Sequence, residues 1–266
     1  MNKDIYGLIG KKIQHSFSPD IHNTLFAEQD IDAEYRLFDV NELTPVVKKM
    51  KNEQIKGVNV TKPYKIKIMD HLDKLDEDVE KIGSSNTISQ HDGEIKGYNT
   101  DGVGAKRSLE RFTDIKNKRI LQLGAGGAGR AIAYELSRSS IVTVLNRTLK
   151  KAKCLERFGV KAGGLEKKTL KREFESTDIL INTTSVGMNE KKSLIDPSLL
   201  DEDTVVFDIV YTPLKTKLLK DAEQMGCETI DGLWMLIHQA VLTFQIWTGI
   251  EPDPDHVRKI VMEDIR

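Results

Sequence analysis

The chain has no apolar run long enough to form a membrane span, which needs roughly 18 to 20 residues. Its first ten residues, MNKDIYGLIG, also lack the longer apolar stretch that a signal peptide requires. We therefore expect a cytoplasmic protein that has no membrane partner.

Neither sign of charge predominates, because 40 Lys and Arg residues face 41 Asp and Glu residues. The sequence thus has no basic footprint for nucleic acid. The two cysteines, Cys154 and Cys227, make no disulfide framework, which favours a reduced compartment. The histidines show no metal-ligand spacing such as His-Glu-x-x-His, so we expect no metal. A small-molecule function remains.

Strand and helix patterns alternate along the first part of the chain. They predict strands at 6–10, 34–40 and 57–61 and helices at 18–29, 43–54 and 63–72. Such βαβ alternation favours parallel strands. Asp92-Gly93 lies between two extended runs and predicts a hairpin within 86–99. A helix over about 102–112 follows.

A second alternation begins at Lys118 and predicts strands at 119–124, 141–146, 178–184 and 204–210 and helices at 130–138 and 148–158. A helix that begins near Gly232 is apolar almost all round and should be buried. A last helix covers 256–264. The predicted class is α/β with two α/β domains and a cleft between them. The first is 1–101, completed by C-terminal helices within 236–266, and the second is 102–235.

The segment Gly124-Ala125-Gly126-Gly127-Ala128-Gly129 matches G-x-G-x-x-G. It directly follows a predicted strand and opens a predicted helix, which is the context of a dinucleotide-binding loop. Glycine permits the tight turn, close approach of a pyrophosphate and close packing of helix on strand, and the helix N-terminus attracts the anion. The alternative is a glycine-rich turn that binds nothing.

The end of the next predicted strand favours NADP over NAD. An NAD-binding chain usually places Asp or Glu there to accept from the ribose 2′-hydroxyl. This chain instead has Asn146-Arg147-Thr148, followed by Lys150 and Lys151. A guanidinium can bind a 2′-phosphate with paired donors. The alternative is that Arg147 is a solvated surface charge.

Polar residues also follow the strands predicted in the first domain, at the strand ends where ligands collect in α/β sheets. Ser16 and Ser18 offer two hydroxyls, although Ser18 could simply cap the following helix. Asn59 and Thr61 end the third strand, and Lys65 falls on the first turn of the predicted helix. Asp101 precedes a helix and could be its N-cap.

Nine motifs occur in register along nearly the whole chain: HSxSPxxHN (15–23), NVTxPxK (59–65), SSNT (84–87), GYNTDGxG (97–104), GAGGAGRA (124–131), NRT (146–148), INTTSVGM (181–188), VYTPLKTKLL (210–219) and DGLWMLIHQA (231–240). With them the chain resembles the shikimate dehydrogenase family from end to end. One departure is Lys12, where the family often has proline.

The resemblance implies NADPH-dependent reduction of 3-dehydroshikimate to shikimate, a step toward chorismate and the aromatic amino acids. It implies that Ser16 and Ser18 bind the substrate carboxylate, and that Asn59, Thr61, Asn86, Asp101 and Gln239 bind ring hydroxyls and the carbonyl. Lys65 and Asp101 would be the catalytic pair, with Tyr211 nearby. The implied cofactor residues are the loop Gly124, Ala125, Gly126, Gly127 and Ala128, the 2′-phosphate residues Asn146, Arg147, Thr148 and Lys151, and Thr183, Met188 and Gly232.

Elementary chemistry agrees with these roles. Reduction of a ketone by hydride needs a proton for the developing alkoxide, which an ammonium group at Lys65 can stabilise and supply while Asp101 orients it. Gln239 lies in an apolar helix, where its amide needs a partner, either a ligand or a backbone group. A quinate/shikimate dehydrogenase and a non-catalytic NADP-binding regulator are the competing hypotheses. The protein could be a monomer or a homodimer.

Overall fold

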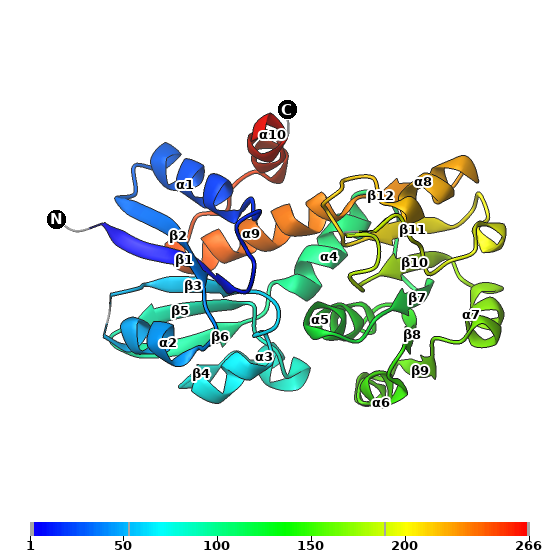
Figure 1. Ribbon diagram of the computed structural model, residues 1–266, viewed down its shortest axis with the longest axis horizontal. Coiled ribbons are helices and arrows are strands. Elements are labelled where there is room, and N and C mark those ends of the chain that lie inside the picture. Colours follow the sequence, from blue (N-terminus) through cyan, green and yellow to red (C-terminus); the bar gives the residue numbers. More distant parts are fainter. Residues whose placement is uncertain (1–2, 53, 189, 265–266) are drawn as a thin grey trace. The chain divides into compact units, whose positions relative to one another are not determined.

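The computed structural model describes residues 3–52, 54–188 and 190–264, and the chain divides into two α/β units (Figure 1). The first unit contains the residues up to Thr100 together with those from Gln239 onward, and the second contains Asp101–His238. This confirms the predicted α/β class. Within the described residues, no helix is both long and apolar enough to cross a membrane.

The first unit is built on a six-stranded sheet with the order β2-β1-β3-β5-β6-β4. Its strands are β1 (Asp4–Gly10), β2 (Ala33–Asp39), β3 (Gly57–Val60), β4 (Lys74–Leu75), β5 (Thr87–His91) and β6 (Glu94–Tyr98). Its helices are α1 (Ser18–Glu28), α2 (Thr44–Lys51), α3 (Glu77–Ile82), α10 (Pro254–Asp264) and the second half of α9 (Gly232–Thr248). As predicted, β1 pairs in parallel with β2 and β3, and β5 and β6 form a hairpin.

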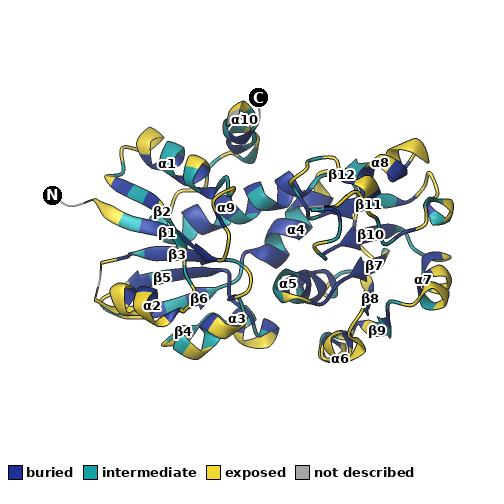
Figure 2. Ribbon diagram, in the orientation of Figure 1, coloured by how far each residue is buried: buried dark blue, intermediate teal, exposed yellow. Residues whose placement is uncertain are grey.

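The central strands β1, β3 and β5 of this sheet are mostly buried (Figure 2). Successive strand residues point to opposite faces of the sheet, and both faces are covered. Ile9, Val58 and Ile88 join the apolar cluster on the α2 side. Tyr6 contacts aromatic rings of α1 and α9 on the opposite face. A side chain at Gly57 would lie 2.5 Å from the indole nitrogen of Trp247, so glycine lets α9 approach the sheet closely. This approach brings polar residues of α9 to the strand ends.

The prediction of a helix over 63–72 is wrong. Residues 62–66 form turns and are followed by a 3₁₀ helix at Lys67–His71. The carbonyl of Lys65 accepts from the N–H of Ser85 at 2.8 Å and is thus engaged outside the segment. The N–H of Met69 instead bonds to the carbonyl of Ile66. Lys65 therefore lies in a turn and not on a helix.

The second unit contains a fully parallel six-stranded sheet with the order β12-β11-β10-β7-β8-β9. Its strands are β7 (Arg119–Leu123), β8 (Ile141–Asn146), β9 (Lys161–Gly164), β10 (Ile179–Asn182), β11 (Val205–Asp208) and β12 (Thr229–Ile230). Its helices are α4 (Asp101–Glu110), α5 (Gly127–Leu136), α6 (Leu149–Lys153), α7 (Lys167–Phe174), α8 (Lys217–Gln224) and the start of α9. The order of the strands reverses between β7 and β10, and ligands bind at such switch points in doubly wound sheets.

Several boundaries in this unit differ from the predictions. The helix after the glycine loop begins at Gly127 and not near Arg130. The predicted helix over 148–158 is divided into α6 and a 3₁₀ turn at Glu156–Phe158. The sequence patterns also missed the elements β4, α3, β9, α7, α8 and β12, most of which are short. The predicted roles of 1–101 and 102–235 as substrate and cofactor domains stay predictions.

Candidate active site

Asn86 and Gln239, predicted to bind substrate, lie together in the first unit. The amide nitrogen of Asn86 donates to Thr100 Oγ1 at 2.8 Å and to Gln239 Oε1 at 3.4 Å. Its Oδ1 accepts from the backbone N–H of Thr100 at 2.8 Å. The amide of Gln239 therefore meets another side chain, a partner that the sequence hypotheses had not included. Gln239 is half-buried, whereas Asn86 is buried.

Asn59 is buried behind Asn86, and its amide is engaged by the protein. Its Oδ1 accepts from the hydroxyl of Tyr35 at 2.9 Å. Its Nδ2 donates to the carbonyl of Asn86 and to the hydroxyls of Thr87 and Thr243, at 3.1 to 3.3 Å. These contacts make Asn59 a support of the Asn86 segment.

Ser16 and Ser18 also come together, with their Oγ atoms 3.1 Å apart. The capping role suggested for Ser18 is wrong. Ser18 is the first helical residue of α1, and the N-cap position belongs to Phe17, whose side chain makes no cap hydrogen bond. Ser16 Oγ instead accepts from the N–H of Ser18 at 3.2 Å, which satisfies one of the free amides at the helix start.

The backbone places Thr61 and Lys65 beside these groups. The N–H of Thr61 bonds to the carbonyl of Ile9 at the end of β1, and the carbonyl of Lys65 bonds to the 84–86 segment through Ser85. Asp101 is buried and is the first residue of α4, which opens the second unit. Lys65 and Asp101 thus belong to different units, and their pairing stays a prediction.

The glycine loop of the second unit follows β7, as predicted. Gly124 has a φ of +109°, and a Cβ there or at Gly129 would lie 2.5 or 2.7 Å from Thr183 Oγ1. A Cβ at Gly126 would meet nothing within 4 Å, and its φ of −80° suits any residue. Neither packing nor backbone conformation requires glycine at 126. The open space at Gly126 would let a pyrophosphate approach the backbone closely.

Two buried side chains fix this loop from inside, Gln122 of β7 and Thr183 after β10. Gln122 Nε2 donates to the carbonyls of Gly124 and Gly129 at 2.9 and 2.8 Å. Thr183 Oγ1 donates to the carbonyls of Leu123 and Gly124 at 2.8 and 3.2 Å. Thr183 therefore supports the loop. Gln122 was missed, although a polar residue within the apolar strand RILQL was a usable signal.

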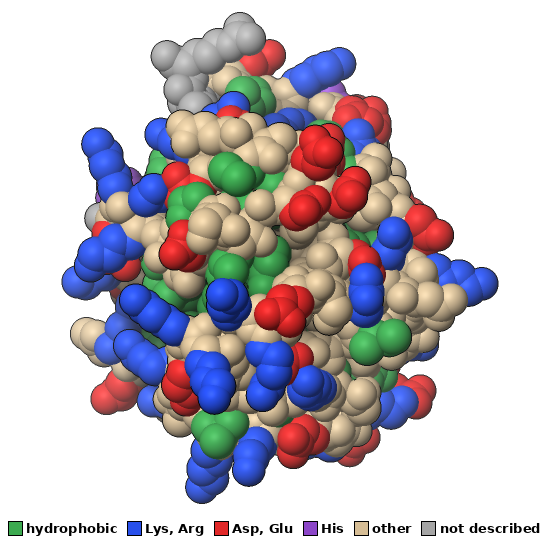
Figure 3. Space-filling view, turned by 90° about the vertical axis from the view of Figure 1, so that its right-hand side faces the viewer, with side chains coloured by type: hydrophobic (Ala, Val, Ile, Leu, Met, Phe, Trp, Pro, Cys, Tyr) green, Lys and Arg blue, Asp and Glu red, His purple; other side chains and the backbone are tan. Residues whose placement is uncertain are grey.

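The segment after β8 joins this loop through Asn146. Its Oδ1 accepts from the N–H of Ala125 at 3.2 Å, and its Nδ2 donates to the carbonyl of Thr148 at 2.9 Å. Arg147, Thr148 and Lys151 are exposed, as are the other basic side chains of α6 and α7. Lys and Arg side chains gather on the lower half of the face in Figure 3. This donor set, which has no carboxylate between residues 146 and 155, suits a phosphate group.

Arg130 adds a further cation at the start of α5. Burial, and next the positive charge of Arg157, lower the pKa of Arg130 from its usual range. A half-buried guanidinium close to the glycine loop adds to the positive potential that the helix N-terminus provides. Sequence reasoning had not singled out this residue.

The remaining predicted cofactor and substrate residues follow β10, β11 and β12. Met188 closes the turn after β10, where its N–H bonds to the carbonyl of Ser185. Tyr211 follows β11, and burial raises the pKa of its phenol. Gly232 begins α9 so close to the backbone of Ile209 that a Cβ would lie 2.5 Å from its carbonyl oxygen. The three therefore share the carboxyl edge of the sheet.

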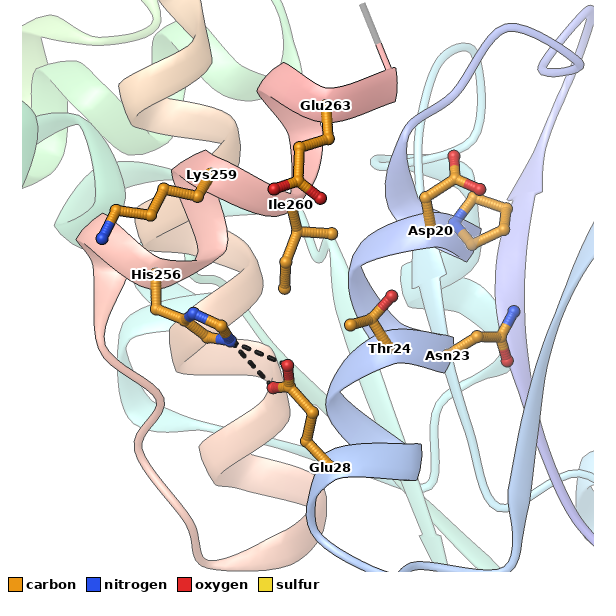
Figure 4. A pocket seen from close by; sticks show the side chains of 9 residues that line it. Asp20, Asn23, Thr24, Glu28, His256, Lys259, Ile260 and Glu263 are labelled. Atoms are coloured by element: carbon orange, nitrogen blue, oxygen red, sulfur yellow. Dashed lines mark hydrogen bonds and ion pairs between the residues drawn. The ribbon is translucent and has the colours of Figure 1, made fainter.

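A groove of about 460 Å³ lies elsewhere in the first unit, between α1 and α10 (Figure 4). His256 Nε2 lies 2.9 Å from both carboxylate oxygens of Glu28 across it. None of the predicted substrate residues lines this groove. Within the described parts of the chain, no group of His, Cys, Asp and Glu could hold a metal ion.

The parallel sheet, its switch point and the glycine loop define a Rossmann-type dinucleotide-binding protein with an added α/β domain. Family models match three segments: the shikimate dehydrogenase substrate-binding domain at residues 8–88, shikimate/quinate 5-dehydrogenase at 105–213, and the shikimate 5′-dehydrogenase C-terminal domain at 232–262.

Whole-chain comparisons agree with these matches. The chain is 52% identical over 259 residues to a shikimate dehydrogenase (NADP(+)) of Pyrococcus abyssi, covering 97% of each chain. It is 40% identical, with a TM-score of 0.92, to the structure of a shikimate dehydrogenase in complex with NADP+, covering 99% and 96% of the two chains. The Thermus thermophilus enzyme in complex with NADP(H) and shikimate is 32% identical, with a TM-score of 0.89 and coverage of 98% and 99%. The chain belongs to the shikimate dehydrogenase family.

Proposed function

We propose that this protein is an NADP-dependent shikimate dehydrogenase that interconverts 3-dehydroshikimate and shikimate. The observation that carries the proposal is the 52% identity along 97% of both chains to a relative bearing that name. The local chemistry supports NADP. Gly126 leaves its backbone open to a pyrophosphate, and exposed Arg147 and Lys151 follow β8 where an NAD-binding chain has an acid.

NADPH, when bound, supplies the hydride. The residues of the chain then have to bind the ketone, orient it and deliver one proton. We assign the substrate carboxylate to the hydroxyls of Ser16 and Ser18, which lie side by side. Thr61, Asn86 and Gln239 are assigned to the ring hydroxyls and carbonyl, and Asn59 holds Asn86 from behind.

Lys65 and Asp101 are the proposed acid–base pair. In the direction of reduction, the Lys65 ammonium donates a hydrogen bond to the carbonyl oxygen, stabilises the developing alkoxide and gives up one proton to it. The Asp101 carboxylate orients the ammonium group and balances its charge. In the reverse direction, neutral Lys65 accepts the hydroxyl proton of shikimate. Tyr211 is assigned a place beside the substrate.

The test is a spectrophotometric assay at 340 nm with shikimate and NADP, run beside shikimate with NAD and quinate with either cofactor. We expect shikimate with NADP to give the largest kcat/KM. Faster turnover of quinate would place the protein with the quinate dehydrogenases. One of these, the Corynebacterium glutamicum enzyme with a structure in complex with NAD, is 31% identical to this chain. Tight NADP binding without turnover of either acid would identify a non-catalytic NADP-binding protein.

A further inference from the structure

One buried carboxyl group joins the two loops that follow β10 and β11. Asp208, the last residue of β11, is fully buried. Its Oδ1 accepts from the amide nitrogen of Asn182 at 2.9 Å and from the N–H of Val210 at 3.1 Å, and its Oδ2 accepts from the hydroxyl of Thr216 at 2.8 Å. Asp208 thus holds both ends of the 209–216 loop and the last residue of β10.

Asn182 extends these contacts through the other loop. Its Oδ1 accepts from the N–H and the hydroxyl of Thr184 at 3.1 and 2.7 Å, and its amide nitrogen also donates to the carbonyl of Val186 at 3.1 Å. Gly187 has a φ of +98°, and a Cβ added there would lie 3.4 Å from the Cβ of Thr216, so this loop passes close to Thr216. One hydrogen-bonded cluster, made by Asp208, Asn182 and Thr216, therefore fixes the loops 183–188 and 209–216.

Packing alone would not favour a carboxyl group here. Burial raises the pKa of Asp208 to about 6, although the hydrogen bonds from Thr216, Val210 and Asn182 act to lower it. Burying a carboxylate opposes folding, and an apolar residue of similar volume often serves a core as well. What an apolar residue cannot do is accept three hydrogen bonds, one from the end of β10 and two from the 209–216 loop. The cluster specifies loop geometry, at the sheet edge where Met188 and Tyr211 lie.

We propose that Asp208 is a positioning residue, which holds the loops 183–188 and 209–216 in the one arrangement that presents Met188 and Tyr211 to the reacting groups. The inference rests on the proposed function, in which Tyr211 lies beside the substrate and Met188, one of the implied cofactor residues, lies close to the nicotinamide. The glycine loop and Arg147 follow β7 and β8, on the other side of β10 in the sheet. Loss of the cluster should therefore reduce turnover far more than it weakens NADP binding.

The experiment compares Asp208→Leu, Asp208→Asn and a control, Asp221→Leu, with the wild type. Asp221 is also a buried carboxyl group of this unit, but it pairs with Lys217 on α8. We expect Asp208→Leu to lower kcat at least tenfold, with the NADP dissociation constant within threefold of wild type. Asparagine keeps an acceptor for Asn182 and Val210, so Asp208→Asn should recover most of the turnover. Asp221→Leu should leave both constants near wild type.

Hydrogen exchange followed by mass spectrometry gives a readout that is independent of catalysis. Asp208→Leu should speed exchange in 184–188 and 209–216. Thr183 bonds to Leu123 and Gly124 and not to the cluster, so exchange in the glycine loop should stay unchanged. If Asp208→Leu does not fold, Thr216→Val removes one donor and should show the same pattern on a smaller scale. Wild-type kcat in the folded variant, or an equal loss in Asp221→Leu, overturns the proposal. If the wild type does not oxidise shikimate, the proposed function fails, and unchanged loop exchange then overturns the positioning role separately.

Discussion

The amide nitrogen of Gln122 lies 2.9 Å from the carbonyl oxygen of Gly124, to which it donates a hydrogen bond from inside the sheet. The same nitrogen binds the carbonyl of Gly129, so one side chain bridges the first and last glycines of the loop. The opposite end of the peptide group between Gly124 and Ala125 is held by Asn146. The glycine loop is thus held in place by contacts on both sides.

Gln122→Leu should therefore weaken cofactor binding. It removes two hydrogen bonds worth about 0.5–1.5 kcal/mol each, so the NADP dissociation constant should rise roughly 5- to 100-fold. Fluorescence titration with NADPH measures this change. Gln90→Leu is the matched control, because Gln90 is a buried strand glutamine of the other unit whose side-chain amide has no hydrogen-bond partner among the described residues. Equal weakening in both variants would refute a specific role for Gln122.

Arg147→Ala should raise the KM for NADP by roughly 10- to 100-fold, because charge-assisted hydrogen bonds are worth about 1.5–3 kcal/mol. The KM for shikimate should change little, and the preference for NADP over NAD should shrink. Arg172→Ala, which removes another exposed arginine of the same unit that pairs with Glu173, is the control. An equal rise in KM for NADP and NAD would mean that Arg147 does not contact a 2′-phosphate.

Lys65→Ala should lower kcat by roughly 10²- to 10⁴-fold, the usual contribution of a general acid or base, while NADP affinity stays near wild type. Lys67→Ala removes an exposed lysine two positions along the same segment and should leave turnover unchanged. Steady-state rates combined with NADPH titration separate the two effects. Loss of NADP binding with normal turnover would contradict the assignment of Lys65.

The sequence predicted those parts of the fold that depend on local pattern. Strands β1, β3 and β8, the hairpin at Asp92-Gly93 and the glycine loop all have strong periodicity or turn chemistry. The predicted helix over 63–72 failed because a tertiary hydrogen bond, from Ser85 to the carbonyl of Lys65, overrides the local helical pattern. Such a contact is not visible in a single segment.

In the candidate site, too, the local sequence pattern predicts some features, whereas contacts between distant segments determine the others. The resemblance identified Asn86 and Gln239 as substrate residues, and the apolar helix indicated that Gln239 needs a partner. The hydrogen bond between them joins positions far apart in the chain. Asp208 lies in an apolar run, FDIV, where nothing local shows that it meets Asn182 and Thr216. Only the folded sheet, in which β10 and β11 are neighbours, brings these three together.

His22 should make the protein sensitive to acid. It is fully buried, its ring stacks on Tyr35 at 4.6 Å, and neither ring nitrogen has a hydrogen-bond partner within residues 3–52, 54–188 and 190–264. Burial lowers the pKa of His22 from 6.5 to about 3. Between these two pH values the unfolded chain binds the proton and the folded chain does not. Stability that is fully present above pH 6.5 is therefore lost as the pH falls toward 3.

Urea unfolding at pH 7 and pH 5 measures this loss, which should be about 2 kcal/mol from His22 alone, since each pKa unit corresponds to about 1.4 kcal/mol. His22→Phe keeps an aromatic ring against Tyr35 but cannot bind a proton, so it should lose about 2 kcal/mol less than wild type over this interval. His256→Gln removes a half-buried histidine that pairs with Glu28, and it should retain the steep dependence of stability on pH that His22 causes. If His22→Phe loses as much stability as wild type, protonation of His22 does not drive the acid sensitivity, and other groups that titrate between pH 5 and 7 must do so.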